Sequence, residues 1–148
     1  MRAVVQRVCN ASVSIDDSQV CSIGKGLMVL LCVEHGDTQK DAEYMSDKIL
    51  NLRIFDDDNG IPNLSLLDIQ GELLAVSQFT LAGDARKGRR PSYSSAELPA
   101  AAKVLFDCFC VRSASFITTQ KGVFQADMQV ALVNDGPFTI LLSSRKEF

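Results

Sequence analysis

Two segments of the sequence place polar or turn-forming residues where an apolar strand would be expected to continue. Ser77-Gln78-Phe79-Thr80 interrupts the apolar run that starts after Glu72, and Asn134-Asp135-Gly136-Pro137-Phe138-Thr139 follows an alternating run. In the first segment, either the strand simply reaches the surface or the polar groups serve a site. In the second, Asn, Asp and Gly favour a tight turn between two strands, because they tolerate positive φ.

Pro137 makes an ordinary turn only one of two interpretations of the second segment. A proline after Gly136 removes a backbone donor at the point where a returning strand would begin. Carbonyl groups then point outward from a stiff corner, and such carbonyls can hold the amine of a ligand and measure the space beside it. The alternatives are therefore a plain hairpin turn and a rigid binding corner.

A third segment, residues 86–90, concentrates positive charge. Arg86, Lys87, Arg89 and Arg90 place four cations within five residues, although the chain has a net charge of −3 and a pI of about 5.1. The global charge argues against a general polyanion binder. Locally, the cluster is either a solvated loop or a patch that contacts phosphates, in which case binding would depend on salt concentration.

The sequence lacks the catalytic motifs of common hydrolases and the ligand sets of metalloproteins. The single histidine, His35, has no nucleophile elbow or other triad motif beside it. The 5 cysteines are odd in number and lie mostly in apolar segments, as expected of buried thiols in a reducing compartment. No metal-ligand set, phosphate loop or cofactor motif is recognisable. If the protein is an enzyme, it works without a triad, metal or cofactor.

The hydropathy pattern predicts a cytoplasmic protein of one domain, residues 1–148. The longest apolar run, Leu27 to Val33, is too short to cross a bilayer, and polar residues interrupt the amino terminus too early for a signal peptide. Periodicity predicts two strands within residues 2–23, a buried strand at 27–33, a helix at 38–52 and a turn at 56–60. It further predicts a strand at 72–81, a helix at 95–113, and strands at 123–133 and 138–143.

This element order, β-β-β-α-β-α-β-β, indicates a mixed α/β fold. Two helices cannot cover both faces of so many strands. We therefore expect a layered, partly closed β-sheet with the two helices packed on one side. Thr38 and Asp41 form a capping-box pattern at the start of the first helix. Pro99 is compatible with the second helix only in its first turn.

Motifs distributed nearly end to end carry a resemblance to one family. The sequence resembles the D-aminoacyl-tRNA deacylases, also called D-tyrosyl-tRNA deacylases. The combination of SQFTL at 77–81 with NDGP at 134–137 is specific, whereas either motif alone would be weak. The other matching segments are AVVQRV at 3–8, ASV at 11–13, RIF at 53–55, RPSY at 90–93, GVF at 122–124 and ADM at 126–128.

The resemblance implies a homodimer that hydrolyses the ester between a D-amino acid and the 3′-terminal adenosine of tRNA. It implies a cis Gly136-Pro137 bond that reaches into the partner's pocket and excludes L-amino acids by shape, while glycyl-tRNA is accepted. Backbone N–H groups near Phe79 and Thr80 would stabilise the oxyanion, with Ser77 and Gln78 in the same catalytic segment. Attack would come from water assisted by the ribose 2′-hydroxyl, or alternatively from Thr80. The remaining pocket residues would be Met128, Asn134, Phe138 and Thr139.

Phe138 departs from the resemblance, because many relatives carry a smaller residue such as valine there. Two other functions remain open from the sequence. One is a non-catalytic RNA-binding module on the same scaffold, for which residues 86–90 are the best support. The other is an esterase that acts on free amino-acid esters without needing the adenosine.

Overall fold

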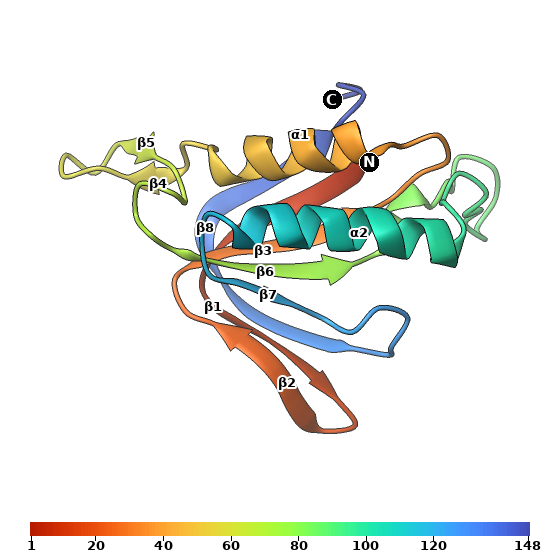
Figure 1. Ribbon diagram of the computed structural model, residues 1–148, viewed down its shortest axis with the longest axis horizontal. Helices are drawn as coiled ribbons and strands as arrows, with labels where there is room; N and C mark the ends of the chain where they lie inside the picture. The colour runs from red at the N-terminus through yellow and green to blue at the C-terminus, as the bar shows by residue number, and fades with distance from the viewer.

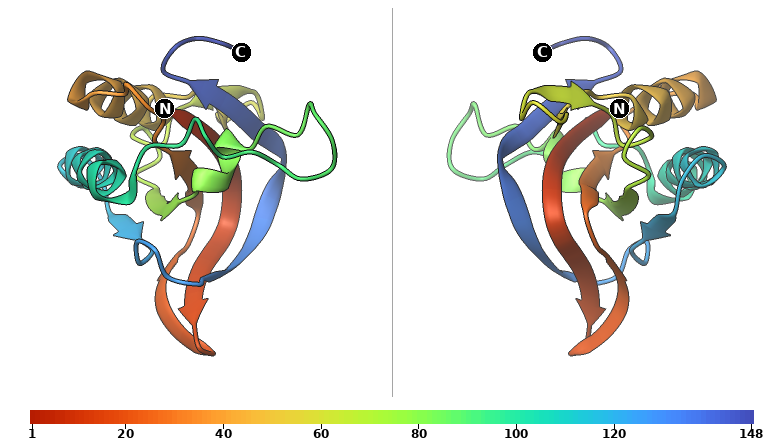
Figure 2. Two further views of the ribbon diagram at one scale, coloured as in Figure 1. Left: turned by 90° about the vertical axis from the view of Figure 1, so that its right-hand side faces the viewer. Right: turned by 90° about the vertical axis from the view of Figure 1, so that its left-hand side faces the viewer.

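The long strand β1 (Arg2–Ile15) organises the sheet of the computed structural model, which describes residues 1–148. Along one edge, β1 pairs antiparallel with β3 (Gly26–Cys32) and then, near its end, with β2 (Ser18–Ile23). Along the other edge it pairs with β8 (Gln129–Ser143). Because β1 changes neighbours halfway along its length, the sheet curls into the barrel-like shape seen in Figure 2.

The other half of the sheet is parallel and carries both helices on one face. β6 (Glu72–Ser77) runs parallel to β3, and β7 (Thr119–Lys121) runs parallel to β6. The helices α1 (Gln39–Leu50) and α2 (Pro99–Ala114) lie side by side over this sheet (Figure 1). The mixed α/β class, the partly closed sheet and the placement of both helices on one side are thus confirmed. Neither helix has the length and apolar character needed to cross a membrane.

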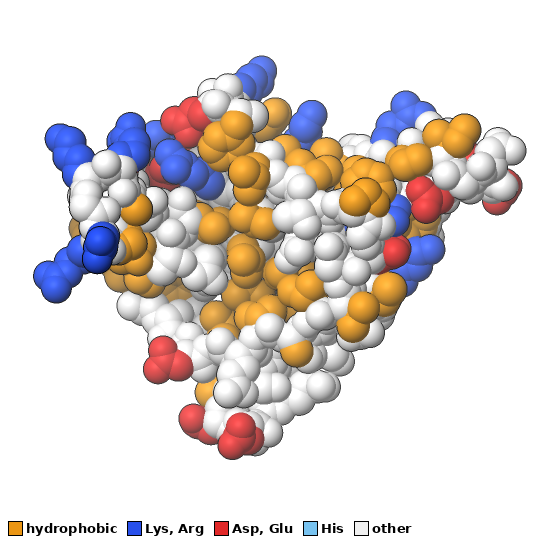
Figure 3. Space-filling view, turned by 180° about the vertical axis from the view of Figure 1, so that it is seen from behind, with side chains coloured by type: hydrophobic (Ala, Val, Ile, Leu, Met, Phe, Trp, Pro, Cys, Tyr) orange, Lys and Arg blue, Asp and Glu red, His pale blue; other side chains and the backbone are white.

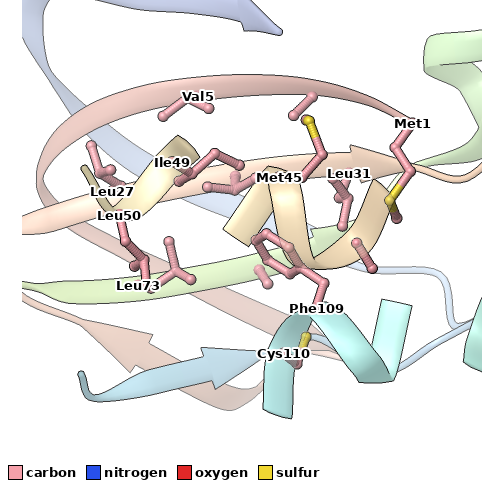
Figure 4. Packing of buried hydrophobic residues seen from close by; sticks show 14 of the residues in the cluster. Met1, Val5, Leu27, Leu31, Met45, Ile49, Leu50, Leu73, Phe109 and Cys110 are labelled. Atoms are coloured by element: carbon pink, nitrogen blue, oxygen red, sulfur yellow. The ribbon is translucent and has the colours of Figure 1, made fainter. Parts of the chain in front are cut away.

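Two hydrophobic clusters hold the sheet, one on each face. Alternate residues of a strand point to opposite faces, so Leu31 of β3 joins the cluster under the helices while Met28 joins the cluster inside the curl. Figure 4 shows Met45 of α1 and Phe109 of α2 packed over the helix-facing side of the sheet. Strands buried on both faces read as continuous apolar runs, which is why the strand at 27–33 was readily predicted.

The helix boundaries follow from their first residues. The Thr38 N–H donates to the Asp41 carboxylate at 2.9 Å, as the capping-box pattern predicts, and α1 begins at the next residue, Gln39. Pro99 occupies the first position of α2, where its missing N–H removes no intrahelical bond. The second helix therefore begins four residues later than the predicted boundary at Ser95.

The predicted strand 72–81 is too long, because β6 ends at Ser77 and the chain then turns. The Gln78 N–H still donates to the Leu31 carbonyl at 2.9 Å, but the Leu81 N–H donates to the Gln78 carbonyl at 3.3 Å. This second bond closes the one-turn helix η1 (Phe79–Ala82). The turn at 56–60 is confirmed, and it joins two short strands that were not predicted, β4 (Phe55–Asp56) and β5 (Pro62–Leu64).

The two predicted carboxyl-terminal strands were wrong in their bounds. Residues 122–128 form a loop, and β8 then runs without a break from Gln129 to Ser143. The alternating exposure of Phe124 to Gln129 is real, but this segment crosses from β7 to the opposite edge of the sheet and finds no strand to pair with. The predicted turn between two strands at 134–137 is therefore absent, and those residues lie inside β8.

Candidate active site

The segment Ser77–Thr80 lies at the carboxyl end of β6, next to the end of β3. Ser77 is in register with Leu31, so the buried parallel pair fixes where the segment leaves the sheet. The one-turn helix η1 starts immediately afterwards at Phe79. The first N–H groups of a helix have no partner within it, so the N–H groups of Phe79 and Thr80 are available at this turn.

The side chains of this segment include no ionised nucleophile. The Gln78 side-chain amide donates to the Thr80 hydroxyl. Behind the segment, the Cys32 thiol donates to the Phe79 carbonyl at 3.6 Å. Burial, followed by the nearby Glu34 carboxylate, raises the pKa of Cys32 to about 11, so this thiol is protonated at neutral pH. The candidate nucleophile Thr80 thus has no base bonded to it, and the Cys32 thiol behind it is neutral.

A cleft of about 980 Å³ opens beside this segment. Its walls are the end of β6, the first half of α2 and residues 124–130, and no Lys or Arg lines it. The exposed ring of Phe79 lies edge-on to Tyr93, with 5.2 Å between ring centroids. Thr80 and Asn134 to Thr139 are not part of its lining. The lining includes Ser77, Gln78, Phe79, Tyr93, Phe106 and Met128.

Glu97 lies just before α2 and is a carboxylate of the cleft that forms hydrogen bonds within the chain. Its Oε1 accepts from the Leu98 N–H at 2.8 Å and lies 3.1 Å from Nδ1 of His35. The Leu98 N–H is the main reason that the pKa of Glu97 is lowered. Glu97 is therefore ionised at neutral pH and is poorly suited to act as a general base. The chain has no group of three His, Cys, Asp or Glu side chains placed to hold a metal ion.

The Gly136-Pro137 corner protrudes from β8 as a wide bulge. Asn134 is in register with Val8 and Thr139 with Gln6, so the four residues 135–138 stand opposite Arg7 alone. The Gly136-Pro137 peptide bond is cis, which confirms that implication of the resemblance. Asn134 lies at the base of the bulge, and its side-chain amide donates to the carbonyls of Arg7 and Phe138.

Arg7 supports the corner from beneath and was missed by the sequence analysis. Its guanidinium donates to the carbonyls of Asp135 at 3.0 Å, Gly136 at 3.1 Å and Ile54 at 2.7 Å. It also lies 4.5 Å from the centre of the Phe138 ring. Arg7 is only 5% exposed. A signal was present, because Arg7 continues the buried series of alternate β1 residues that begins with Ala3 and Val5.

Within one chain, the corner and the Ser77–Thr80 segment are far apart. The corner faces Arg7, which pairs with Leu27 at the start of β3, whereas Gln78 bonds to Leu31 near its end. Four residues of strand separate these two levels by about 13 Å. The corner also lies three strands away across the sheet, because β1 and β3 stand between β8 and β6. The structure therefore does not bring the two predicted parts of the site together in a single chain.

The basic loop, residues 84–92, leaves η1 and returns before α2. Backbone bonds of 2.8 and 2.9 Å between Asp84 and Ser92 close its base. Arg86 forms a two-pronged pair with Asp84 at 2.9 and 2.7 Å, and this pairing holds the pKa of Asp84 well below its usual range. Lys87, Arg89 and Arg90 are exposed and have no acidic partner. In Figure 3 one group of Lys and Arg side chains lies at the left margin, where this loop lies.

An apolar surface covers the face of the sheet that the helices leave open. Val5 joins the helix-facing cluster, so its neighbour Val4 points to the opposite face. Leu30 and Leu141 are the register partners of Val4 and share its face, and Leu141 is 57% exposed. Figure 3 shows hydrophobic side chains running down the middle of this face.

Fold and site together define a curled-sheet α/β protein with one large cleft and no side-chain triad beside it. Residues 4–143 match the family model described as D-Tyr-tRNA(Tyr) deacylase. The chain is 57% identical over 148 residues to a D-aminoacyl-tRNA deacylase of Kosmotoga olearia, with 100% of both chains covered. It is 55% identical over 149 residues to the D-aminoacyl-tRNA deacylase of Clostridioides difficile, again with 100% of both covered. The chain belongs to the D-Tyr-tRNA(Tyr) deacylase family, a family of hydrolases.

Two solved structures share this fold. A structure described as c-Myc DNA Unwinding Element Binding Protein superposes with a TM-score of 0.92 at 42% identity, covering 97% of this chain and 98% of that one. A probable eukaryotic D-amino acid tRNA deacylase superposes with a TM-score of 0.83, covering 95% and 97% of the two chains. At 18% identity, the second structure supports the fold alone.

Proposed function

We propose that the protein hydrolyses the ester bond of D-aminoacyl-tRNA and releases the free D-amino acid and tRNA. The observation that carries the proposal is the full-length identity of 57% to a D-aminoacyl-tRNA deacylase. The cleft beside Ser77–Thr80 is large enough for a terminal aminoacyl-adenosine, since ligand pockets span about 300–1,000 Å³. Such a reaction corrects mischarged tRNA and belongs in the cytoplasm, where tRNA is charged.

The proposed chemistry relies on the main chain and on the RNA. The N–H groups of Phe79 and Thr80 stabilise the negative charge that develops on the ester carbonyl, and one such donor is typically worth about 10²–10³ in rate. Water attacks with help from the ribose 2′-hydroxyl. Thr80 is the less favoured nucleophile, because its hydroxyl accepts a hydrogen bond from Gln78 and no carboxylate or imidazole bonds to it.

The proposed enzyme is a homodimer in which each corner enters the partner's cleft. Three observations support a second copy. The corner and the Ser77–Thr80 segment are separated within one chain, β8 pairs with β1 alone and so leaves its outer edge unpaired, and the sheet face around Leu141 is apolar and uncovered. An unpaired edge strand and an open apolar face are both features that proteins commonly cover.

Gly136-Pro137 is the proposed chiral wall. The Cα hydrogen of a D-residue fits against it, whereas the side chain of an L-residue collides with it. Glycine has no side chain to reject, so glycyl-tRNA is also a substrate. A Cβ built on Gly136 meets no atom within 4 Å, and Gly136 has no positive φ. The chain's own fold thus gives no reason for glycine at this position, which is consistent with a requirement imposed by a partner or a substrate.

Residues at the edges of the cleft contact the substrate and the tRNA in the proposed complex. Phe138 and Thr139 border the partner's pocket in the proposed dimer, and Met128 lines the cleft of its own chain. Lys87, Arg89 and Arg90 contact tRNA phosphates, because they are exposed and uncompensated. Arg86 contributes less to these contacts, because Asp84 already neutralises it.

The direct test is to incubate the protein with matched D- and L-tyrosyl-tRNA and to follow the loss of the ester. The proposal predicts rapid loss of the D-ester and of glycyl-tRNA, with the L-ester intact. Binding of both tRNAs without cleavage of either would instead favour a non-catalytic RNA-binding module. Cleavage of free D-tyrosine esters at an equal rate would favour a general esterase.

A Thr80→Ala variant separates the two routes of attack. The RNA-assisted route predicts turnover within a fewfold of the unsubstituted protein, and a tRNA that ends in 2′-deoxyadenosine should then be cleaved poorly. If Thr80 is the nucleophile, the variant loses turnover while its affinity for tRNA is retained.

A further inference from the structure

The bulge in β8 is closed at its base by one side chain, Asn134. The two N–H groups of its amide serve two carbonyls, that of Arg7 on β1 at 2.8 Å and that of Phe138 at 3.1 Å. Asn134 is the last residue in register before the bulge, and Phe138 is the residue before pairing resumes at Thr139. The amide therefore bridges the point where the chain leaves the ladder and the point where it returns.

Asn134 and Arg7 both hold the corner through hydrogen bonds to main-chain carbonyls. The Asn134 amide donates to the Arg7 carbonyl, while the Arg7 guanidinium donates to the carbonyls of Asp135 and Gly136. Both donors of the Asn134 amide are thus used within its own chain, so the amide has no N–H left for a substrate. A carboxylate at this position could donate to neither carbonyl, because an ionised Asp is an acceptor only.

We propose that Asn134 is a positioning residue that fixes how far Gly136-Pro137 projects from the sheet and thereby sets the discrimination between D- and L-substrates. This inference rests on the proposed function of the corner. It differs from a role in substrate binding, because the Asn134 amide donates both of its hydrogen bonds within its own chain. Chiral exclusion by shape tolerates little displacement, since a shift of about 1 Å in a positioned group can change a rate by 10²-fold.

The test uses Asn134→Asp and a matched control, Asn10→Asp. Asn10 is exposed, belongs to β1 and is in register with Val133, the residue before Asn134, but its side chain makes no hydrogen bond. Both variants add the same charge at neighbouring places on the β1–β8 ladder. The measurement is kcat/KM for D- and L-tyrosyl-tRNA, together with KM for the D-substrate alone.

The inference predicts that Asn134→Asp raises the ratio of L- to D-cleavage at least tenfold, while Asn10→Asp leaves the ratio unchanged. Asn134→Ala, which loses the donors without adding charge, should move the ratio in the same direction and serves if the Asp variant fails to fold. A higher KM for the D-substrate with an unchanged ratio would mean that Asn134 contacts the substrate and would overturn the inference. An unsubstituted protein that cleaves neither tRNA would instead refute the proposed function itself.

Discussion

The two parts of the proposed site are supported in opposite ways. Ser77–Thr80 emerges from the buried parallel pair of β3 and β6, and its turn is closed by bonds between residues three apart in sequence. The Gly136-Pro137 corner projects from an edge strand and is tied down by residues far away in sequence, above all Arg7, whose bond to Gly136 spans 129 residues. Ser77–Thr80 is anchored in the core, whereas the Gly136-Pro137 corner projects outward and is held by residues distant in sequence.

This difference suggests a division of labour. A turn at the end of a buried parallel strand can hold backbone N–H groups still, because the core on both sides of the sheet fixes it. An outward corner with nothing near its Gly136 Cβ position can act only on something that arrives from outside the chain. The two parts are therefore suited to meet across an interface between two copies.

The largest expected effect comes from removing the support of the corner. In Arg7→Met, the carbonyls of Ile54, Asp135 and Gly136 lose their donor in a largely buried place. We expect a loss of about 3 kcal/mol in the free energy of unfolding, measured by urea denaturation. The matched control is Arg112→Met, because Arg112 pairs with Asp47 at a surface where both are partly exposed; its cost should be below about 1 kcal/mol. Equal costs for the two variants would refute the role assigned to Arg7.

Alanine substitutions at Gly26 and Gly136 compare the packed core of the sheet with the exposed corner. A methyl group at Gly26 would collide with the backbone carbonyl of Glu72 and force β3 and β6 apart. Gly26→Ala should therefore cost about 2 kcal/mol of stability, within the range of overpacked sites. Gly136→Ala should change the stability of the single chain by less than about 0.5 kcal/mol. A large loss of thermal stability in Gly136→Ala that does not depend on protein concentration would mean that the fold itself requires glycine at the corner.

The basic loop should have a smaller effect, on tRNA affinity alone. Replacing Lys87, Arg89 and Arg90 by alanine should make the dependence of log affinity on log salt shallower by roughly 2, as expected for about three phosphate contacts to single-stranded RNA. Arg86→Ala should change this slope less, because Asp84 compensates Arg86 in the free protein. Filter binding at several salt concentrations measures both. Identical slopes for the triple variant and the unsubstituted protein would mean that the loop is only solvated surface.

The smallest effect concerns the thiol behind Ser77–Thr80. Because burial raises the pKa of Cys32 to about 11, its thiolate is scarce at pH 8 and grows about tenfold per pH unit toward that value. Iodoacetamide should label the exposed Cys9 at pH 8 and leave Cys32 unlabelled, with Cys32 labelling rising as the pH increases. Mass spectrometry of digested protein measures both sites. Rapid labelling of Cys32 at pH 8 would show an activated thiol in the site.

The sequence predicted the parts of the site that depend on local chemistry. Ser77–Thr80 was visible because polar residues interrupt an apolar run, and the corner because proline follows Gly136. The alternation of β1 places Arg7 in a buried series, but its role was missed because its hydrogen-bond partners are carbonyls 47 to 129 residues away. The start of the predicted strand 123–133 was wrong for a related reason, since only residues 129–133 belong to β8. Phe124 and Met128 are half-buried and alternate with exposed residues, as in a strand. A strand also needs a neighbouring strand to pair with, however, and only the topology decides that.

Mixing two inactive variants tests whether each site takes one part from each of two copies. Phe79→Pro removes one of the two N–H donors of the core-anchored part at the first position of η1, and Gly136→Val impairs the corner, so each homodimer should cleave D-tyrosyl-tRNA poorly. Co-refolding equal amounts gives heterodimers in which one site combines both intact parts. Random pairing then predicts recovery of about a quarter of the unsubstituted activity. No recovery, with heterodimers demonstrated by mass, would place both parts in the same chain and contradict the account.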